Sequence, residues 1–325
     1  MSSRTGSWPL ATAVRLVTFS VVLGAIGCGE AGAPAGQALG RDAPVLSIAG
    51  PLVFACVGDT RPPDEDDTAA YPSSIITQIF TSIEASKPRP AFVVATGDYI
   101  FASNRPEGQA GPQLDLYLEA RSAYRGPFFP ALGNHECTGA TSSNCGDEGA
   151  DGITASYAAF LEKVLAPSFA PPGPGEPYYS VRIGAPGDAW AAKLVVVAAN
   201  AWSNQQAVWL DRALSDATTY TFVVRHEPAD ATTAPGVVPS EAILARHPYT
   251  LILVGHTHTY RHSTDRPREV LVGNGGAPLD GKDYGFAVFA QQPNGSIAVD
   301  MINWRTGEAD EVFHFAVQPD GSAAH

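Results

Sequence analysis

The sequence has few basic residues. Lysine and arginine together number 20 in 325 residues, against 33 aspartate and glutamate residues, which leaves a formal net charge of −13. This balance argues against nucleic acid or an anionic membrane face as an electrostatic partner. An anionic substrate would therefore need positive charge that is concentrated locally, and bound metal ions can supply it.

Long hydrophobic runs and internal repeats are also missing. The N-terminal apolar run, Leu16–Ile26, is too short for a comfortable membrane span. No repeat at solenoid period is found, which excludes that class of architecture. Because Arg4 and Arg15 precede the apolar run, residues 1–27 are predicted to be a signal peptide.

The end of this run indicates how the chain is processed. The sequence Ala25-Ile26-Gly27-Cys28 resembles a bacterial lipoprotein processing site, although Ala25 stands where leucine is usual. We expect Cys28 to be lipidated and the protein to be exported to the bacterial cell envelope, lipid-anchored or periplasmic or extracellular. Any membrane contact would then run through this anchor. The alternative is ordinary cleavage a few residues later, which gives an unmodified soluble product.

Cysteine is scarce, with four in the chain. Export favours disulfides, and Cys137 and Cys145 lie in one loop, close enough to pair. Cys56 lies in an apolar run and is interpreted as a buried strand residue.

The rest of the chain predicts one folded domain after a linker. Residues 28–44 are rich in Gly, Ala and Pro and are predicted to be a flexible tether. Residues 45–318 alternate short apolar runs with helical patterns, as in a layered α/β domain. Helices are expected at Ser73–Ser86 and Gln205–Leu214, and a meander of three antiparallel strands at Tyr284–Phe315. The strands expected before the meander are Leu52–Val57, Ala91–Ala95, Phe128–Leu132, Tyr178–Ile183, Lys193–Ala198, Thr221–Val224 and Thr250–Val254.

Polar motifs come directly after five of these strands. They are Gly58-Asp59, Gly97-Asp98, Gly133-Asn134-His135-Glu136, His226-Glu227 and Gly255-His256-Thr257-His258. Because sites in α/β sheets form outside the carboxyl ends of the strands, we expect the five motifs to meet at one sheet edge. Glycine before the ligand in four of them is expected to let the backbone turn sharply.

These motifs supply a mixed set of oxygen and nitrogen ligands. Two carboxylates, an amide oxygen and three imidazoles suit zinc, manganese or iron better than calcium. Six ligands exceed what one tetrahedral ion uses, whereas two ions bridged by one carboxylate would use them all. The predicted ligands are Asp59, Asp98, Asn134, His226, His256 and His258.

The ordered motifs resemble the calcineurin-like metallophosphoesterase superfamily, in its branch of purple acid phosphatase-like and related bacterial phosphohydrolases. The resemblance implies a four-layer α/β/β/α sandwich of two mixed β-sheets flanked by helices. It also implies two divalent or mixed-valence transition-metal ions, of iron, manganese or zinc. Asp59 and His258 would bind the first ion, and Asp98 would bridge the two. The second ion would be bound by Asn134, His226 and His256.

The resemblance further implies a phosphoric ester hydrolase, a phosphatase or phosphodiesterase acting on a small molecule or a phosphorylated substrate. Its mechanism is direct in-line attack by a metal-bridging hydroxide. His135 would be catalytic and would assist the leaving group, and Asn134 would also contact substrate. Glu136 and Glu227 are expected to support the ligands beside them.

The first motif departs from the common pattern. It reads Asp59-Thr60-Arg61, and arginine cannot replace the histidine that usually follows as a ligand, because it only donates hydrogen bonds. Purple acid phosphatases place a ligating tyrosine where this chain has Phe101, and Tyr99 is not expected to substitute, because successive strand-end residues point in opposite directions. We expect Arg61 to contact substrate phosphate, with a salt bridge to the acidic residues 64–67 as the alternative.

Two other functions are considered. A metallo-β-lactamase is excluded, because Tyr260 and Arg261 stand where its His-x-His-x-Asp-His motif needs Asp and His. A non-catalytic envelope or binding protein, which keeps the fold with an incomplete metal site, stays open on account of Arg61.

Overall fold

The computed structural model describes residues 45–138, 145, 154–169, 176–184, 187, 190–279, 283–306 and 309–324. The predicted signal peptide, its tether and the lipidation site at Cys28 lie outside these residues. Within them, no helix has the length and apolar character needed to cross a bilayer.

One sheet contains six strands and is mixed. Strands β2, β3 and β4 run parallel to one another, and β11, β12 and β13 continue the sheet in antiparallel fashion. The order across the sheet is β13 (Ala309–Val317), β12 (Ile297–Asn303), β11 (Gly285–Gln291), β2 (Val53–Val57), β3 (Val93–Ala95) and β4 (Phe128–Pro130). The predicted C-terminal meander is therefore confirmed, and it extends the sheet that begins with β2.

The other sheet contains seven strands and is also mixed. Its centre is parallel, from β6 through β7 and β8 to β10, while the pairs β5/β6 and β9/β10 are antiparallel. The order is β1 (Val45–Leu46), β5 (Tyr179–Ile183), β6 (Ala192–Val197), β7 (Tyr220–Arg225), β8 (Leu251–Val254), β10 (Arg266–Val272) and β9 (Tyr260–Ser263).

Aromatic rings join the facing sides of the two sheets. Phe54 of β2 stacks on Phe92 and Phe289 with ring centroids 4.9 and 4.6 Å apart, and it meets Phe222 of β7 edge to face at 4.9 Å. The next residue along β7, Val223, points to the opposite face of the sheet, into a separate apolar cluster. The principal core therefore lies between the sheets.

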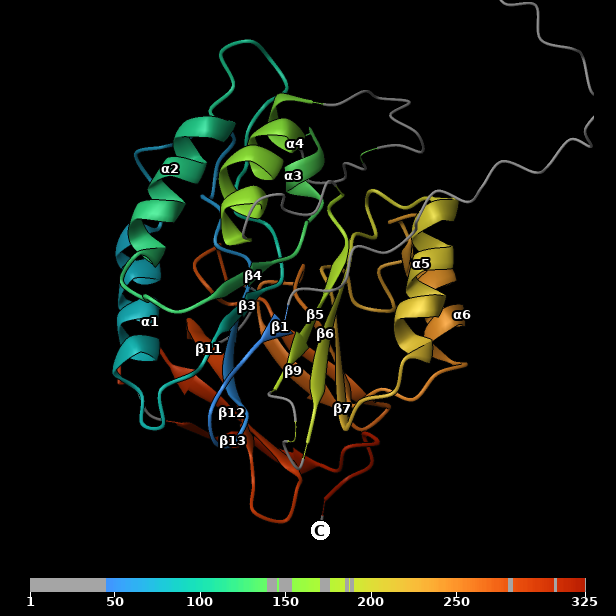
Figure 1. Ribbon diagram of the computed structural model, residues 1–325. Coiled ribbons are helices and arrows are strands. Elements are labelled where there is room, and N and C mark those ends of the chain that lie inside the picture. Colours follow the sequence, from blue (N-terminus) through green and yellow to red (C-terminus); the bar gives the residue numbers. More distant parts are fainter. Residues whose placement is uncertain are drawn as a thin grey trace, which may run out of the picture. The chain divides into compact units, whose positions relative to one another are not determined.

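Helices cover the outer faces. Figure 1 shows α1 (Ser73–Ala85) and α2 (Ala110–Arg121) on one side of the strands, and α5 (Asn204–Ser215) and α6 (Val237–Leu244) on the other. Ile79 and Phe80 of α1 are fully buried, and Leu210 of α5 and Leu244 of α6 pack in the cluster that contains Val223. The short helices α3 (His135–Thr138) and α4 (Ala155–Ala159) follow β4, and a π-helical turn continues α4 over Phe160–Leu165. This is the predicted four-layer α/β/β/α arrangement.

Helix α2 is not among the helices that the sequence analysis predicts. Leu114, Leu116 and Leu118 alternate along the sequence, so the apolar pattern carries no helical period. In the structure the buried face of the helix includes Leu114 and Tyr117, three apart, and the Tyr117 ring packs against Phe80 of α1. Packing against a neighbouring helix therefore decides this element.

Candidate metal centre

The predicted ligands converge, but from two sheets rather than at the edge of one. Asp59, Asp98 and Asn134 follow β2, β3 and β4 of the six-stranded sheet. His226 follows β7, and the motif that ends in His258 follows β8, both in the seven-stranded sheet. The sequence patterns did not reveal that the strands belong to two sheets, so the expectation of one shared edge was wrong.

Two groups of side chains lie close enough to hold a metal ion. One consists of Asp98, His226 and His256, and the other of Asp59, Asp98 and His258, with the ligand atoms of each group within 4.8 Å of one another. Asn134 joins the first group, because its Oδ1 lies 3.0 Å from His256 Nδ1 and 3.2 Å from His226 Nε2. Asp98 is common to both groups, as a bridging ligand must be.

Backbone carbonyls orient two of the imidazoles. The Nδ1 atom of His226 donates to the carbonyl of Thr96 at 2.9 Å, which leaves Nε2 facing Asp98 Oδ2 at 3.2 Å. The Nδ1 atom of His258 donates in the same way to the carbonyl of Pro278 at 2.7 Å. A ring nitrogen that is held in this way presents the other nitrogen as a lone pair, which is the form that binds a metal. The donor set therefore fits two transition-metal ions.

Three of the ligand residues adopt a backbone conformation that is uncommon outside glycine. The φ angles of Asp59, Asp98 and His256 are 56°, 57° and 73°. The preceding Gly97 turns as expected, with φ of 114°, but Gly255 serves a different purpose: a Cβ atom there would lie 2.4 Å from Asp59 Oδ2. Holding a non-glycine residue in this left-handed conformation costs of order 1–3 kcal/mol of folding free energy, and such residues cluster at functional sites.

Glu136 ties two ligand loops together. Its fully buried carboxylate accepts hydrogen bonds from the backbone N–H groups of Asp98 at 2.9 Å, Tyr99 at 2.8 Å and Gly133 at 2.8 Å. Burial and the nearby charge of Asp98 raise the pKa of Glu136 to about 7. Glu227 is also buried, and its burial raises the pKa of its carboxyl.

The buried ligands have strongly perturbed acidities. Burial, together with the carboxylate of Asp98, raises the pKa of Asp59 well above its ordinary value. Burial would raise the pKa of Asp98 too, but the neighbouring His226 and His135 hold it well below its ordinary value. Burial and His226 lower the pKa of His256 to about 4. Opposing shifts among adjacent buried groups are typical of functional sites.

All five motifs of this centre fall within the segment that matches a known family. Residues 52–260 match the model of the calcineurin-like phosphoesterases. The chain belongs to this family of phosphoric ester hydrolases. The family uses a dinuclear metal site, and the two ligand groups that share Asp98 are the candidates for it in this chain.

Solved structures share the fold of this phosphoesterase at low sequence identity. A purple acid phosphatase from yellow lupin (Lupinus luteus) has a TM-score of 0.59 at 14% identity, over 84% of this chain and 55% of the lupin chain. A dimetal phosphatase from Danio rerio has a TM-score of 0.54 at 13% identity, over 82% and 99% of the two chains. GAP50, the anchor in the inner membrane complex of Plasmodium, has a TM-score of 0.53 at 17% identity, over 83% of this chain and 89% of the GAP50 chain. No curated protein matches the chain significantly.

Arg61 lies beside the candidate ligand group of Asp59, Asp98 and His258. Its side chain is buried, with Nη2 3.4 Å from Nε2 of His258 and Nη1 donating to the carbonyl of Pro62. Among the residues described, no carboxylate lies within ion-pair distance of Arg61, and its Nε has no hydrogen-bond partner. The alternative salt bridge to residues 64–67 is absent there, because Asp66 pairs with Arg105 instead.

The aromatic residues after Asp98 have separate contacts. Tyr99 points away from the centre, since its hydroxyl donates to the carbonyl of Ala131 and its ring packs against Tyr117. Phe101 lies under Arg61, whose guanidinium carbon is 5.0 Å from the ring centroid, and its ring meets that of His135 edge to face at 4.9 Å. Sequence reasoning treated Phe101 only as a missing ligand, because an aromatic contact between distant loops leaves no sequence signal.

His135 lies beside the shared carboxylate. Its Nε2 is 3.9 Å from Asp98 Oδ2, and its backbone N–H donates to Asp98 Oδ1 at 3.1 Å. The side chain is 2% exposed, so it is more enclosed than the predicted contact with an ester suggests.

A disulfide joins Cys137, in the same short helix, to Cys145, whose backbone N–H donates to the carbonyl of Asn200. Cys56 is a buried free thiol, as its place in a strand indicates.

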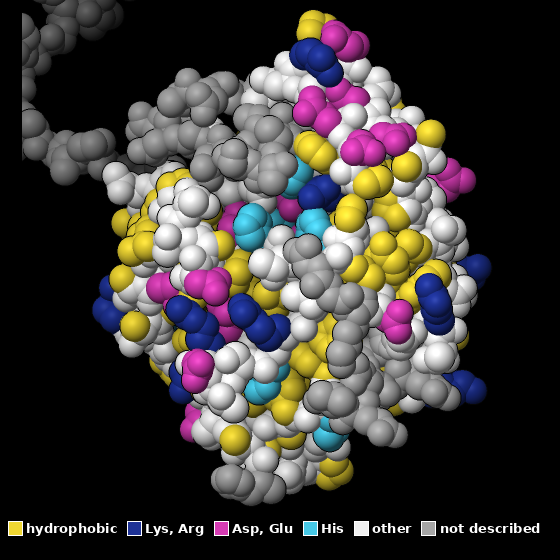
Figure 2. All heavy atoms as spheres, turned by 180° about the vertical axis from the view of Figure 1, so that it is seen from behind, with side chains coloured by type: hydrophobic (Ala, Val, Ile, Leu, Met, Phe, Trp, Pro, Cys, Tyr) yellow, Lys and Arg dark blue, Asp and Glu magenta, His cyan; other side chains and the backbone are white. Residues whose placement is uncertain are grey.

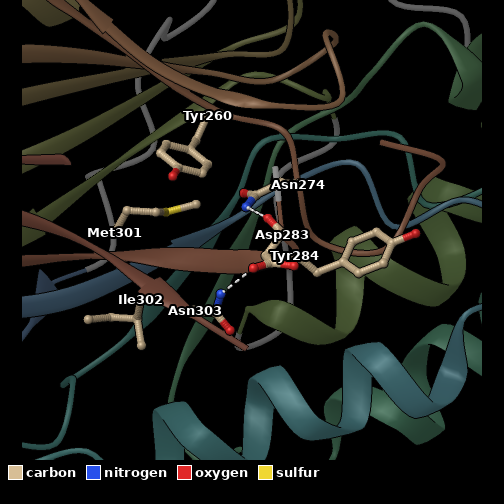
Figure 3. Close-up of a pocket in the computed structure, with 7 residues that line it drawn as sticks. All are labelled: Tyr260, Asn274, Asp283, Tyr284, Met301, Ile302 and Asn303. Carbon is tan, nitrogen blue, oxygen red and sulfur yellow. Dashed lines mark hydrogen bonds between the residues drawn. The ribbon is translucent and has the colours of Figure 1, made fainter. Parts of the chain in front are cut away.

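The face in Figure 2 gathers histidine side chains next to basic and acidic ones, in keeping with a polar centre on an otherwise mixed surface. A separate small pocket, with a volume of about 40 Å³, lies beside the loop that follows β10 (Figure 3). None of the predicted ligands lines it. Its lining residues are Tyr260, Asn274, Asp283, Tyr284, Met301, Ile302 and Asn303.

Proposed function

We propose that this phosphoesterase hydrolyses phosphate monoesters or diesters at a centre of two transition-metal ions, of iron, manganese or zinc. The observation that carries the proposal is the sharing of Asp98 between two ligand groups, one completed by His226 and His256 and the other by Asp59 and His258. Two bound cations would offset the charge of the phosphoryl group and lower the pKa of a water molecule held between them.

The protein's own residues divide the remaining work. Asp59, Asp98 and the carbonyl-oriented imidazoles would hold the ions, together with the amide oxygen of Asn134, which faces the ring nitrogens of His226 and His256. His135, beside Asp98, would donate a proton to the leaving oxygen of the ester. Arg61 is a buried cation without a carboxylate partner in the described part of the chain, which suits it to bind a phosphoryl oxygen.

Hydrolysis of an aryl phosphate and of its diester tests the proposed function. We expect turnover that is lost on treatment with a chelator, regained with manganese or zinc, and lost permanently in the Asp98→Ala variant, because that change removes a ligand from both positions. The exposed Asp115→Ala variant on α2 is the matched control and is expected to keep full turnover. A metal-loaded, folded protein without turnover on either ester would contradict the proposal.

Arg61→Ala tests the phosphate contact. A hydrogen bond to a charged group contributes about 1.5–3 kcal/mol, so we expect the inhibition constant of inorganic phosphate to rise about 10- to 100-fold. The exposed Arg105→Ala variant, which loses only partners at the surface, should leave the constant unchanged. An unchanged constant in Arg61→Ala would reject the contact.

A non-catalytic binding protein is the second candidate. It is favoured by one observation, the presence of Arg61 and Phe101 beside the group of Asp59, Asp98 and His258. Binding of inorganic phosphate, without turnover of the aryl phosphate or its diester, would support a non-catalytic binding protein.

We also propose that the protein is exported to the cell envelope and anchored there through Cys28. The apolar run Leu16–Ile26 ahead of that cysteine supports export. The disulfide between Cys137 and Cys145 supports an oxidising compartment.

A further inference from the structure

The two ion positions are not equivalent in this chain. The second position has four donors, from Asp98, Asn134, His226 and His256, whose ligand atoms face one another. Among the residues that the structure describes, the first has three, from Asp59, Asp98 and His258, and a cationic side chain lies against one of them. The difference between the positions therefore rests on what Arg61 does at His258.

The hydrogen bonds of His258 assign its tautomer. A carbonyl oxygen only accepts, so the bond to Pro278 at 2.7 Å places a proton on Nδ1. Guanidinium only donates, so Nη2 of Arg61, at 3.4 Å, faces the lone pair of Nε2. That lone pair is the one with which His258 would bind the first ion. An ion and the guanidinium cannot both use it.

The guanidinium is held in place by neighbouring groups. Its carbon lies 5.0 Å from the centroid of the Phe101 ring, an arrangement that stabilises a cation. The backbone of Phe101 is fixed in turn by the buried side chain of Gln113, which accepts from its N–H at 2.7 Å and donates to its carbonyl at 2.9 Å. These contacts are apolar or neutral. The guanidinium interacts with the carboxyl of Asp59 only through space, and no carboxylate of the described residues lies within ion-pair distance of it.

We propose that Arg61 competes with the first ion for Nε2 of His258, and that a bound phosphoryl group draws Arg61 away from it. Phosphate would then favour the first ion twice, by supplying an anion to the guanidinium and by freeing the imidazole. Linkage requires the reverse effect as well: the first ion strengthens phosphate binding by the same factor. This inference rests on the proposed two-metal function and makes the first ion conditional on substrate.

Calorimetric titration of the full chain with manganese, with and without inorganic phosphate, tests the proposal. For the wild type without phosphate we expect one tight ion and a second that binds at least about tenfold more weakly. Phosphate should tighten the weaker ion by about 30-fold, within the usual range of coupling between sites. The dissociation constant of the tighter ion should change little.

Arg61→Met is the decisive variant, because methionine keeps an unbranched chain but neither donates nor repels. Without phosphate its weaker ion should bind about fivefold more tightly than in the wild type, and the effect of phosphate should fall to about threefold, the part that any phosphate-bridged pair of ions retains. Phe101→Leu removes the ring but keeps the guanidinium. It should change the affinity of the weaker ion and the effect of phosphate in the same direction as Arg61→Met, but by less. Arg105→Met, at an exposed arginine, is the matched control.

Two equally tight ions in the wild type without phosphate would overturn the proposal, as would unchanged constants in both Arg61→Met and Phe101→Leu. Turnover of an aryl phosphate, measured on the same samples, separates this failure from a failure of the proposed function. If the protein turns over the ester but binds both manganese ions with equal affinity, only the competition of Arg61 for His258 is rejected. If the second ion binds only with phosphate and the ester is not turned over, only the hydrolase function is rejected.

Discussion

Replacement of His135 with alanine is expected to lower the turnover of an aryl phosphate by about 10²–10⁴-fold while the metal content stays the same, because a general acid contributes a factor of this size. The side chain lies 3.9 Å from the shared Asp98 but belongs to neither ligand group. A series of esters gives the sharper measurement. The loss should be largest for esters with the most basic leaving oxygens, which depend most on protonation.

The neighbouring Asn134→Ala variant is the matched control for this division of roles. Because the Asn134 amide oxygen faces both His226 and His256, its removal should deplete the second ion and lower turnover at the same time. Metal analysis of the two purified variants distinguishes the roles. If His135→Ala lost the same ion as Asn134→Ala, the assignment of His135 as an acid would be wrong.

Glu136→Ala is expected to destabilise the fold and loosen both ions together. The change leaves the buried N–H groups of Asp98, Tyr99 and Gly133 without an acceptor. Each unsatisfied buried group costs about 1–3 kcal/mol, so the free energy of unfolding should fall by about 3 kcal/mol or more. Urea unfolding measures that fall, and manganese titration measures the accompanying loss of affinity at both positions.

Two further variants sharpen this test. Glu136→Gln keeps one acceptor oxygen and should recover part of the lost stability, while Glu119→Ala, at an exposed residue on α2, should change neither quantity. A Glu136→Ala protein as stable as the wild type, with both manganese constants unchanged, would show that the three hydrogen bonds do not position the ligands.

The strand-end motifs made most of the site predictable. Asp59, Asp98 and Asn134 could be placed beside one another because parallel strands end at the same edge, and the sequence order of the remaining histidines then matched a known family. What the motifs could not reveal was how the strands divide between the two sheets, because pairing such as that of β2 with β11 joins segments more than 200 residues apart. Local patterns carry no information about such pairing.

Helix α2 and the strands β9 and β10 illustrate the same limit. Leu114, Leu116 and Leu118 alternate in the sequence, and only packing against α1 selects the helical face. In the hairpin Tyr260–Val272, exposed arginines interrupt the apolar pattern, and the pairing with β8 decides the strand.

The sequence by itself determined which side chains are the candidate metal ligands, because glycine-flanked polar residues after apolar strands have few other uses in this order. It also determined that Arg61 and Phe101 are not ligands, since neither side chain can donate an electron pair. Only the tertiary structure decided what these two residues do instead. Their contacts with His258 and His135 join loops from different strands, and such contacts depend on distances that arise when the two sheets pack together.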